Sequence, residues 1–592
     1  MAQSAFVCSA ARFDYESVLK PLVDLIKANK KATTYRKARW RRFTAFIAIV
    51  PHLTENTIFT QPTSDREPNH ISPKDLSGPG KGSTKSPQSA FEIMRTRYGP
   101  GALALILVAL AGIIKLAEPL GGDQSLFLIG AHALHDGAVL YRDFWDLKQP
   151  GIYAFYFAAT ALGPYGALTI HAFELAYLMA FSLVLTVVLR GSHTFARVAV
   201  AAPLTAVAYY YLAVGSFEAI QVESLVGFPL FCTLAAFILG FRARESRPRR
   251  VYFFLGGAAA AIVLAFKIIF VPIVAAFWFV ALIDAHRREG LTTRQLIEAT
   301  TATAGGVAFP TIAILAFFFA RGALATALQT WFVLPPRIVK SVPHETAAML
   351  ASGIRWFVHR FAGMLVLAAV GAIVALRREA DAFALGAFAW IACGVLVILL
   401  QVTSWFQYQW LLLAVPIGLL AVLGARALFD IARAPIATPV PRILASSVLF
   451  LGTVLFPATL IASDIAPLAR HGFALSATSR ELYRDAVSTV YAALRADARF
   501  VAPNQGSLYV IGDPTFYVVA NRLQPVALNG SSVRLFLPEQ WVTLEDELTT
   551  ARPTYLYLSH GVTISSRALT ETIAHRYRIL HRGNLGDLYV AT

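Results

Sequence analysis

The sequence has few charged residues: Asp, Glu, Lys and Arg make up 15% of its 592 residues, and 56% are hydrophobic. Soluble domains carry roughly 25% charged residues, so this composition excludes an ordinary soluble protein. The high hydrophobic content also excludes disorder of the whole chain, because disordered segments have low hydrophobicity. The composition indicates an integral membrane protein.

Cysteine is also scarce, with three widely separated residues, Cys8, Cys232 and Cys393. Their number and spacing exclude a disulfide framework and a thiolate metal site. The sequence has no glycine-rich phosphate loop beside a strand–helix unit, so nucleotide binding has no support.

Long apolar segments recur along most of the chain. A bilayer core needs about 20 mostly apolar residues per helix, and on this basis we predict about eleven transmembrane helices. They lie near 99–118, 165–189, 197–214, 224–241, 251–266, 270–284, 297–320, 356–376, 382–401, 408–429 and 443–463. The pair within 251–284 is open to two interpretations, two short helices or one long broken helix, because Lys267 and Pro272 interrupt it.

Nearly half of the net charge of +17 lies in residues 1–98, and further along the chain the basic residues are concentrated in alternate loops. One set of loops contains Arg190, Arg197, Arg242, Arg244, Arg247, Arg249, Arg250, Arg287, Arg288, Arg294, Arg377, Arg378, Arg426, Arg433 and Arg442. The intervening loops, 121–164, 215–223, 321–355 and 402–407, are poor in positive charge for their length. Arginine-rich loops mark the cytoplasmic side, so we predict a multi-pass protein of the inner (plasma) membrane with a cytoplasmic N-terminus and a periplasmic C-terminus. The basic excess then predicts no nucleic-acid partner.

Three regions follow from these patterns. Residues 1–98 form a basic, largely disordered cytoplasmic extension. Residues 99–469 form the transmembrane domain, whose first outer loop, 119–164, includes a short interfacial helix at 150–163. Residues 470–592 recover a soluble composition and predict a small α/β outer domain. Its expected strands are 507–513, 554–559, 577–582 and 587–592, and its expected helices are 478–497 and 538–551.

The first outer loop concentrates charged residues at the membrane edge. Residues 122–150, GDQSLFLIGAHALHDGAVLYRDFWDLKQP, include Asp123, Asp143, Asp146 and Lys148. Charges packed against apolar neighbours at a membrane edge are costly to bury and are often functional. The alternative is a solvated loop with helix caps, since Asp123 lies just beyond the first span.

These residues resemble the C-type (GT-C) integral-membrane glycosyltransferases. An acidic residue follows the first membrane helix, and a Tyr-x-Asp-x-Trp-x-x-Lys-x-Pro-Gly stretch comes after it. More narrowly, the pattern is similar to family 39, which includes the protein O-mannosyltransferases, and to the lipid A aminoarabinose transferase branch. The resemblance covers roughly 99–592. The matching residues are Asp123, Tyr141, Asp143, Trp145, Lys148, Pro150, Gly151 and Tyr153.

The resemblance implies transfer of a sugar from a polyprenyl-phosphate donor to a lipid, glycan or protein acceptor on the outer face. Asp123 matches the acid that would act as general base on the acceptor hydroxyl, a task suited to a positioned carboxylate. Lys148 and Lys267 match lysines that would face the donor phosphate. A phosphate partner would offset the cost of a lysine within an apolar run.

The sequence also departs from the family pattern. The family often has two adjacent acids after the first span, whereas Gln124 follows Asp123 here, so Asp143 or Asp146 would supply the second acid. Asp123 and Asp143 are the predicted catalytic residues. Gln149 replaces the first proline of a usual Lys-Pro-Pro, and His171 stands where an arginine is common.

Other residues in the outer loops are candidates for ligand contacts. Arg337 is a candidate for donor-phosphate binding. The candidates for substrate binding are Tyr141, Trp145, Asp146, Glu223 and Tyr408. Glu223 resembles a family acid near the donor site. Sugars stack on aromatic rings, but Trp and Tyr also form belts at membrane interfaces.

A divalent metal is a candidate cofactor, with no ligand set fixed by the sequence. His132 and His135 could bind it with Asp136 or Asp123, but two loop histidines without fixed geometry are a weak signal. Two rival functions also stay open. One is a transporter or flippase of lipid-linked glycans, which predicts paired repeats with broken helices; the other is a noncatalytic protein of envelope-polysaccharide assembly. The sugar, the acceptor, the oligomeric state and the role of residues 1–98 are left open.

Overall fold

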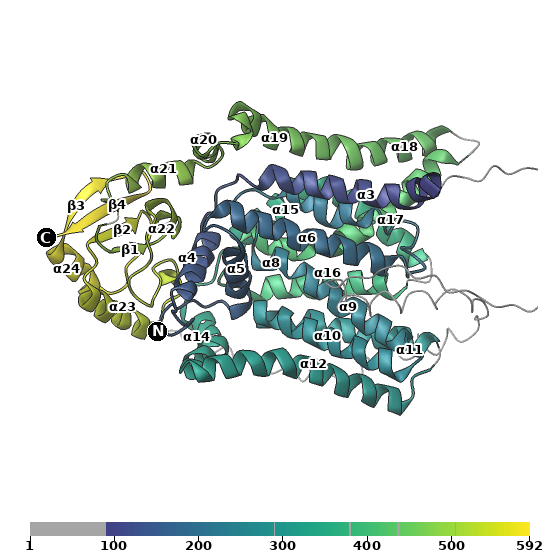
Figure 1. Cartoon of the computed structure of the whole chain (residues 1–592), viewed down its shortest axis with the longest axis horizontal. Helices are drawn as coiled ribbons and strands as arrows, with labels where there is room; N and C mark the ends of the chain where they lie inside the picture. The colour runs from purple at the N-terminus through teal and green to yellow at the C-terminus, as the bar shows by residue number, and fades with distance from the viewer. Residues whose placement is uncertain (1–89, 289, 378–380, 435–438, 504) are drawn as a thin grey trace, which may run out of the picture. The chain divides into compact units, whose positions relative to one another are not determined.

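The computed structural model describes residues 90–592 except 289, 378–380, 435–438 and 504, with the backbone alone for 90–98. The predictions for residues 1–89 and for Arg378 therefore fall outside the described residues. Residues 90–592 form one compact unit. It is predominantly helical, with one small sheet near the C-terminus (Figure 1).

Nine helical segments among the described residues are long and apolar enough to cross a bilayer. They are α6 (Ala167–Leu189), α8 with α9 (Val222–Arg242), α10 (Ser246–Phe266), η3 with α11 (Ile268–Arg288), α12 (Thr293–Ala320), α15 (Ala347–Arg377), α16 (Ala382–Leu400), η5 with α17 (Gln407–Arg433) and α18 with η6 and α19 (Pro439–Arg470). These segments confirm nine of the predicted spans and the polytopic helical class.

The count of eleven is not confirmed. The predicted span 99–118 corresponds to the end of α3 (Ala90–Lys115), whose apolar part, Gly99–Lys115, is shorter than the nine long segments. In the predicted span 197–214, turns precede a short apolar helix, Leu204–Ala213. Hydropathy alone does not distinguish such turns from a continuous helix.

The two interpretations of 251–284 are now resolved. Lys267 ends α10 with an extended backbone, φ −164° and ψ 117°. The chain then begins a new helical segment, Ile268–Arg288, which has 21 residues, the same length as α10. Each part is long enough to span by itself, so the segment forms two helices rather than one broken helix.

The long helices combine close backbone contacts with outward-facing apolar side chains. A Cβ atom on Gly371 of α15 would lie 1.9 Å from the carbonyl oxygen of Leu420, and one on Gly424 of α17 would lie 1.9 Å from that of Leu367. Only glycine permits this approach, which is typical of packed membrane helices. On α12, Phe319 is 75% exposed, as expected for a helix surrounded by lipid.

Loops that we assigned to the same side of the membrane come together in the structure. The contacts join Gln124 to Ser216, Arg142 to the carbonyl of Arg321, and the Glu345 N–H to the carbonyl of Val402. They connect all four of the loops poor in positive charge. The alternation of loops is thus consistent with the structure, and the assignment of this end to the periplasm stays a prediction.

The C-terminal region is an α/β domain, as predicted. Its sheet has the order β1-β2-β4-β3, with β1 and β2 parallel and the other pairs antiparallel. The strands are β1 (Leu508–Ile511), β2 (Tyr555–Ser559), β3 (Tyr577–Arg582) and β4 (Gly586–Ala591). The helices are α20 (Ala477–Val487), α21 (Thr489–Ala498), α22 (Thr515–Ala520), α23 (Pro538–Ala551) and α24 (Arg567–Arg576). All four predicted strands are confirmed, whereas α22 and α24 were not predicted.

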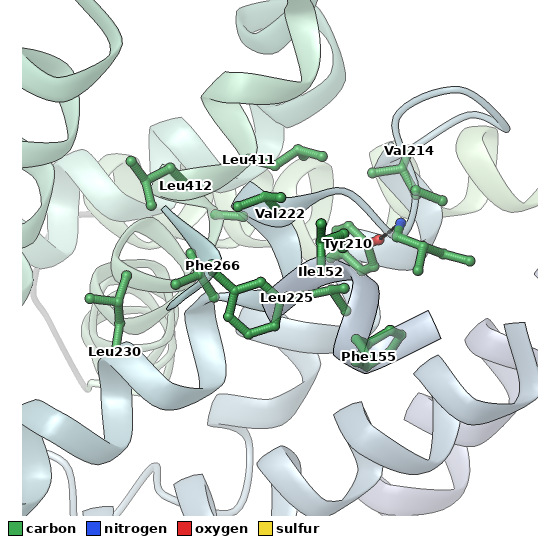
Figure 2. Packing of buried hydrophobic residues seen from close by; sticks show 14 of the residues in the cluster. Ile152, Phe155, Tyr210, Val214, Val222, Leu225, Leu230, Phe266, Leu411 and Leu412 are labelled. Atoms are coloured by element: carbon green, nitrogen blue, oxygen red, sulfur yellow. Dashed lines mark hydrogen bonds between the residues drawn. The ribbon is translucent and has the colours of Figure 1, made fainter. Parts of the chain in front are cut away.

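An apolar core supports the segments that carry the polar residues described below. Figure 2 shows Ile152 of α5 (Pro150–Leu162) close to Leu225 of α8, and Val222 of α8 and Leu412 of η5 belong to the same hydrophobic cluster. All four side chains are buried. The helix predicted at 150–163 is confirmed as α5, which begins with a proline at a position that favours helix starts. Its 13 residues are too few to span a bilayer, and its place at the interface stays a prediction.

Candidate functional site

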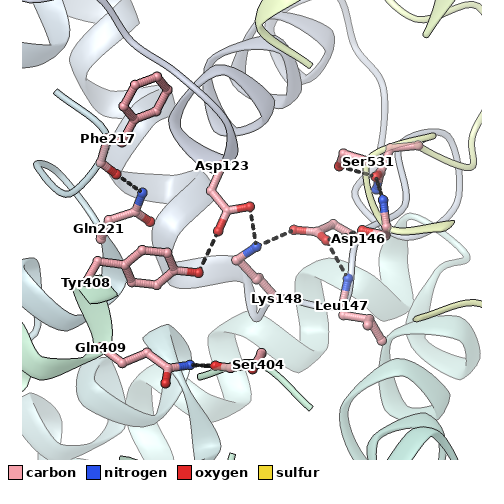
Figure 3. A network of polar contacts seen from close by, with 12 residues as sticks. Asp123, Asp146, Leu147, Lys148, Phe217, Gln221, Ser404, Tyr408, Gln409 and Ser531 are labelled. Carbon is pink, nitrogen blue, oxygen red and sulfur yellow. Dashed lines mark hydrogen bonds and ion pairs between the residues drawn. The ribbon is translucent and has the colours of Figure 1, made fainter. Parts of the chain in front are cut away.

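Lys148 lies between two aspartates of the first loop (Figure 3). Its Nζ is 3.3 Å from Oδ1 of Asp123 and 3.9 Å from Oδ2 of Asp146. It also lies 5.1 Å from the centroid of the Phe127 ring, whose face attracts a cation. The structure thus brings together three of the residues that the sequence singled out. We call Asp123 and Asp146 the carboxylate pair.

Asp123 is the first residue of α4 (Asp123–His135) and follows Gly122, whose φ of 50° favours glycine. Its carboxylate extends toward a distant segment: Oδ2 accepts a hydrogen bond of 2.9 Å from the hydroxyl of Tyr408. Together with Lys148, this contact fixes both carboxylate oxygens. Asp123 therefore connects the first loop to η5, while 28% of its side chain stays exposed.

The surroundings of Asp123 favour its charged form. Burial disfavours ionisation, but the Lys148 charge and the hydrogen bonds from Tyr408 and Lys148 outweigh it, so the pKa of the Asp123 carboxyl lies below its ordinary value. Burial likewise opposes the charge on Lys148, yet the nearby carboxylates of Asp123 and Asp146 hold the pKa of its ammonium above the ordinary value. Both groups are therefore charged at neutral pH.

Asp146 is almost completely buried and well satisfied by hydrogen bonds. The hydroxyl of Tyr153 donates to Oδ2 over 2.8 Å, and the N–H of Leu147 donates to Oδ1 over 2.8 Å. A buried charge is tolerated only with such partners. Asp146 thus holds Lys148 in place and is itself held by α5, the helix that carries Tyr153.

Tyr141 supports the turn that carries Lys148. Its φ of 73° is unusual for a bulky residue. The hydroxyl donates to the carbonyl of Lys148 over 2.8 Å and accepts a 2.8 Å hydrogen bond from Nε1 of Trp331. A backbone strained in this way costs roughly 1–3 kcal/mol and persists where its surroundings stabilise it.

Trp145 contacts the C-terminal domain with both its backbone and its ring. Its N–H donates to the carbonyl of Ala527 over 2.9 Å, and its carbonyl accepts from the Asn529 side chain. The indole N–H donates to Thr330, 3.3 Å away, and the ring centroid lies 5.9 Å from that of Phe536. Trp145 is 5% exposed, so its contacts are with protein.

Two predicted site residues lie apart from the carboxylate pair. Asp143 forms an ion pair of 2.7 Å with Arg142, which is the main reason that the pKa of Asp143 lies below its ordinary value. Arg337, on α14 (Leu334–Ser341), forms an ion pair of 2.6 Å with Glu539 of α23. Among the described residues, no hydrogen bond or ion pair joins either of them to Lys148.

Lys267 lies in a second polar cluster, which includes Glu223. Its Nζ is 2.7 Å from Oε1 of Glu223 and 2.6 Å from Oε1 of Gln401. Glu223 is almost completely buried, and 22% of the Lys267 side chain is exposed. Lys267 lies at the break between α10 and η3, and from this position its ammonium reaches both Glu223 and Gln401.

Two residues of this region were not among the predicted site residues. Gln124 accepts from the Gly121 N–H and donates to the carbonyl of Ser216 over 2.7 Å, so it fastens the first loop to the second. Arg534, on η8 (Val533–Leu535) of the C-terminal domain, lies 4.6 Å from the centroid of the Phe406 ring. The approach of Arg534 to Phe406 depends on how the C-terminal domain packs, and no local sequence pattern reveals that packing.

The described residues offer no group of three or more His, Cys, Asp or Glu side chains arranged to hold a metal ion. His132 stays 4.0 Å from Asp136, and His135 contacts the Phe157 carbonyl and the Thr160 hydroxyl. The two histidines thus have partners outside the carboxylate pair.

Comparisons with known proteins find likeness at the level of structure. No family model and no curated protein matches the sequence. Solved structures that are similar to this one include two crystal structures of ArnT from Cupriavidus metallidurans. The one bound to undecaprenyl phosphate is 12% identical, with a TM-score of 0.46 over 84% of this chain and 98% of that chain. The one in the apo state is 13% identical, with a TM-score of 0.46 over 82% and 97%.

Proposed function

We propose that this protein is a membrane glycosyltransferase of the GT-C type, which moves a sugar from a polyprenyl-phosphate donor to a hydroxyl of a lipid, glycan or protein acceptor. The observation that carries the proposal is the position of Lys148 between Asp123 and Asp146, on the loop whose motif resembles this class. A partly exposed carboxylate next to a fixed cation provides a proton acceptor and a phosphate ligand side by side.

In the proposed reaction, the acceptor oxygen attacks the anomeric carbon of the donor sugar. A bond forms between these atoms, the bond from that carbon to the phosphate oxygen breaks, and the hydroxyl proton passes to Asp123. General-base catalysis of this kind contributes typically 10²–10⁴-fold. The hydrogen bond from Tyr408 orients the carboxylate for this transfer. The lipid phosphate leaves as an anion and keeps the bonding electrons.

Lys148 and Lys267 are the proposed ligands of the donor phosphate. Each is paired with a carboxylate in the structure, Lys148 with Asp123 and Lys267 with Glu223. A phosphate would replace these carboxylates as the closest anion, because hydrogen bonds from cations to phosphate are strong. Polyprenyl phosphate and the bilayer are therefore the proposed partners.

The other site residues have supporting roles in this proposal. Asp146 takes the role of the second acid by orienting Lys148 from its buried position. Asp143, 38% exposed, is the candidate for contact with the acceptor. Tyr141 and Trp145 maintain the shape of the loop, and Arg337, 48% exposed, is a candidate for outer contacts with the donor phosphate.

The proposal is tested by mass spectrometry of envelope glycans and polyprenyl-phosphate sugars from cells with and without the gene. We expect the deletion to accumulate one polyprenyl-phosphate sugar and to lose one sugar from an envelope lipid, glycan or protein. A flippase would instead leave lipid-linked glycans trapped on the cytoplasmic side. Unchanged donor levels together with unchanged glycans would contradict a transferase.

A further inference from the structure

Arg534 lies on a turn of the C-terminal domain that rests on the first loop. The Ser532 N–H donates to Oδ1 of Asn529 over 3.0 Å, and the Asn529 amide donates to the carbonyl of Trp145. The Ser532 hydroxyl is 3.5 Å from Oδ1 of Asp146. These contacts fix the turn beside the carboxylate pair. Arg534 lies two residues after Ser532, the last residue of the turn that is bonded to Asn529.

The guanidinium of Arg534 reaches the aromatic residues that hold Asp123. It lies 4.6 Å from the centroid of the Phe406 ring, and Phe406 stacks on Tyr408 with a centroid distance of 5.4 Å and an interplanar angle of 23°. Tyr408 in turn donates to Asp123. Charge on Arg534 also contributes to the lowered pKa of Asp123. Arg534 therefore faces the same region as the proposed base.

Arg534 is less firmly neutralised than the two lysines. Its ion pair in the described structure is with Glu345, at 3.6 Å, and 49% of its side chain is exposed. Lys148 has two carboxylates, and Lys267 has one at 2.7 Å. A guanidinium has five N–H donors in a planar fork, and stacking on a ring leaves the edge of that fork open. This edge matches the geometry of phosphate oxygens.

We propose that Arg534 is a substrate-binding residue, supplied by the C-terminal domain, that donates to a phosphoryl oxygen of a substrate. The inference rests on the proposed function and adds a residue and a domain to its substrate site. The phosphoryl group has two possible sources, the lipid phosphate of the donor and a phosphate on the head group of the acceptor. In either case Glu345 is the resting partner that the phosphate displaces.

The alternative is that Arg534 has a purely structural role, in which its ion pair with Glu345 joins the C-terminal domain to the loop before α15. The two roles differ in what happens when each partner is changed. A structural ion pair is lost equally in Arg534→Gln and in Glu345→Gln. A phosphate ligand is lost in Arg534→Gln but kept in Glu345→Gln, which removes only the competing carboxylate.

The test measures binding of undecaprenyl phosphate to the full-length protein in nanodiscs, with undecaprenol as the neutral control lipid. Phosphatidic acid serves as a phosphate monoester without a polyprenyl tail. The variants are Arg534→Gln, Arg534→Lys and Glu345→Gln. Arg567→Gln, which removes an exposed ion pair with Glu571 on α24, is the matched control. Thermal unfolding of each variant shows whether it is folded.

We expect Arg534→Gln to weaken binding of a phosphorylated lipid about tenfold, as for loss of a charged hydrogen bond. Glu345→Gln, which removes the competing carboxylate, should bind that lipid at least as tightly as wild type, and undecaprenol binding and Arg567→Gln should be unaffected. Weakening confined to undecaprenyl phosphate identifies the donor as the source, and weakening of phosphatidic acid identifies a phosphorylated head group. Equal losses in Arg534→Gln and Glu345→Gln, or no loss in either, overturn the inference. A wild-type protein that binds these lipids but has no role in sugar transfer would overturn the proposed function and leave the phosphate site standing.

Discussion

The ammonium of Lys148 lies 3.3 Å from the carboxylate of Asp123, so the proposed phosphate ligand is also the counter-ion of the proposed base. This arrangement couples the two roles. When a donor phosphate draws the ammonium toward itself, Lys148 stabilises the charge on Asp123 less. The pKa of Asp123 then rises, and the carboxylate becomes a better proton acceptor in the presence of the donor than in its absence.

Replacing Lys148 should change the pH dependence of transfer. The pKa of Asp123 is lowered chiefly by Lys148 against the opposing effect of burial, so Lys148→Gln raises it. Because the base must be ionised, the acid limb of the pH–rate profile should move to higher pH, with a lower maximal rate. Lys148→Arg should keep the limb near its wild-type position. An acid limb that is identical in wild type and Lys148→Gln would contradict the coupling.

The same pair predicts how stability responds to acid. A carboxyl with a folded pKa below its unfolded value stabilises the fold fully above the unfolded pKa and loses this contribution as the pH falls through the folded pKa. Asp123→Asn should therefore reduce the acid sensitivity of unfolding below pH about 4, the ordinary range of an aspartate. The measurement is denaturant unfolding at a series of pH values. Parallel pH curves for the two proteins would contradict this role.

Lys267 should contribute to the binding of polyprenyl phosphate. Lys267→Gln would leave Glu223 buried without its cation, so the double variant Lys267→Gln/Glu223→Gln provides a neutral pair that preserves folding. We expect this double variant to bind undecaprenyl phosphate about tenfold more weakly than wild type, through loss of a charged hydrogen bond. Unchanged affinity in a folded double variant would exclude Lys267 from the phosphate site.

A buried ionic cluster away from the site should matter for stability. Nζ of Lys115 lies 2.9 Å from both Glu118 and Asp464 and donates to the carbonyl of Val214. Lys115 is 2% exposed, so Lys115→Met leaves two carboxylates without their cation. We expect a loss of about 3–5 kcal/mol in the free energy of unfolding, measured by chemical denaturation in detergent. A loss no larger than that of the surface variant Arg567→Gln would contradict this account.

Trp145 should stabilise the packing of the C-terminal domain against the first loop and should not affect the affinity for substrate. Trp145→Phe removes the indole hydrogen bond to Thr330 and part of the contact with Phe536. We expect a loss of about 1–3 kcal/mol in stability and faster amide exchange in residues 526–532, with the donor KM unchanged. A raised KM with normal stability would instead support direct contact with substrate.

Much of the fold could be predicted because its signals are local. Nine spans and four strands follow from runs of apolar residues and from the composition of short segments. The predicted span 197–214 contains turns and a short helix instead of one long helix, because apolar composition does not show where a chain turns. Helices α22 and α24 were missed because each is short and depends on packing against the rest of its domain.

The site was predictable only as far as the motif extends. The resemblance singled out Asp123 and Lys148, which are in contact. It left the second acid open between Asp143 and Asp146, which are three residues apart. The unusual backbone of Tyr141 and the ion pair of Asp143 with Arg142 decide which carboxylate faces Lys148. Neither the backbone conformation of Tyr141 nor the ion pair of Asp143 can be predicted from the amino-acid sequence.

The measurement that tests the central claim most directly is transfer by Asp123→Asn in cells that lack the wild-type gene, followed by mass spectrometry of donor and product. Asparagine keeps the size of the side chain and can accept the Tyr408 hydrogen bond, but it cannot take a proton. We expect the variant to fold and to reach the membrane, and its transfer rate to fall about 10²–10⁴-fold, with the donor accumulating as in the deletion. Arg567→Gln should transfer normally. Full transfer by Asp123→Asn would show that Asp123 is not the base and would contradict the proposed mechanism.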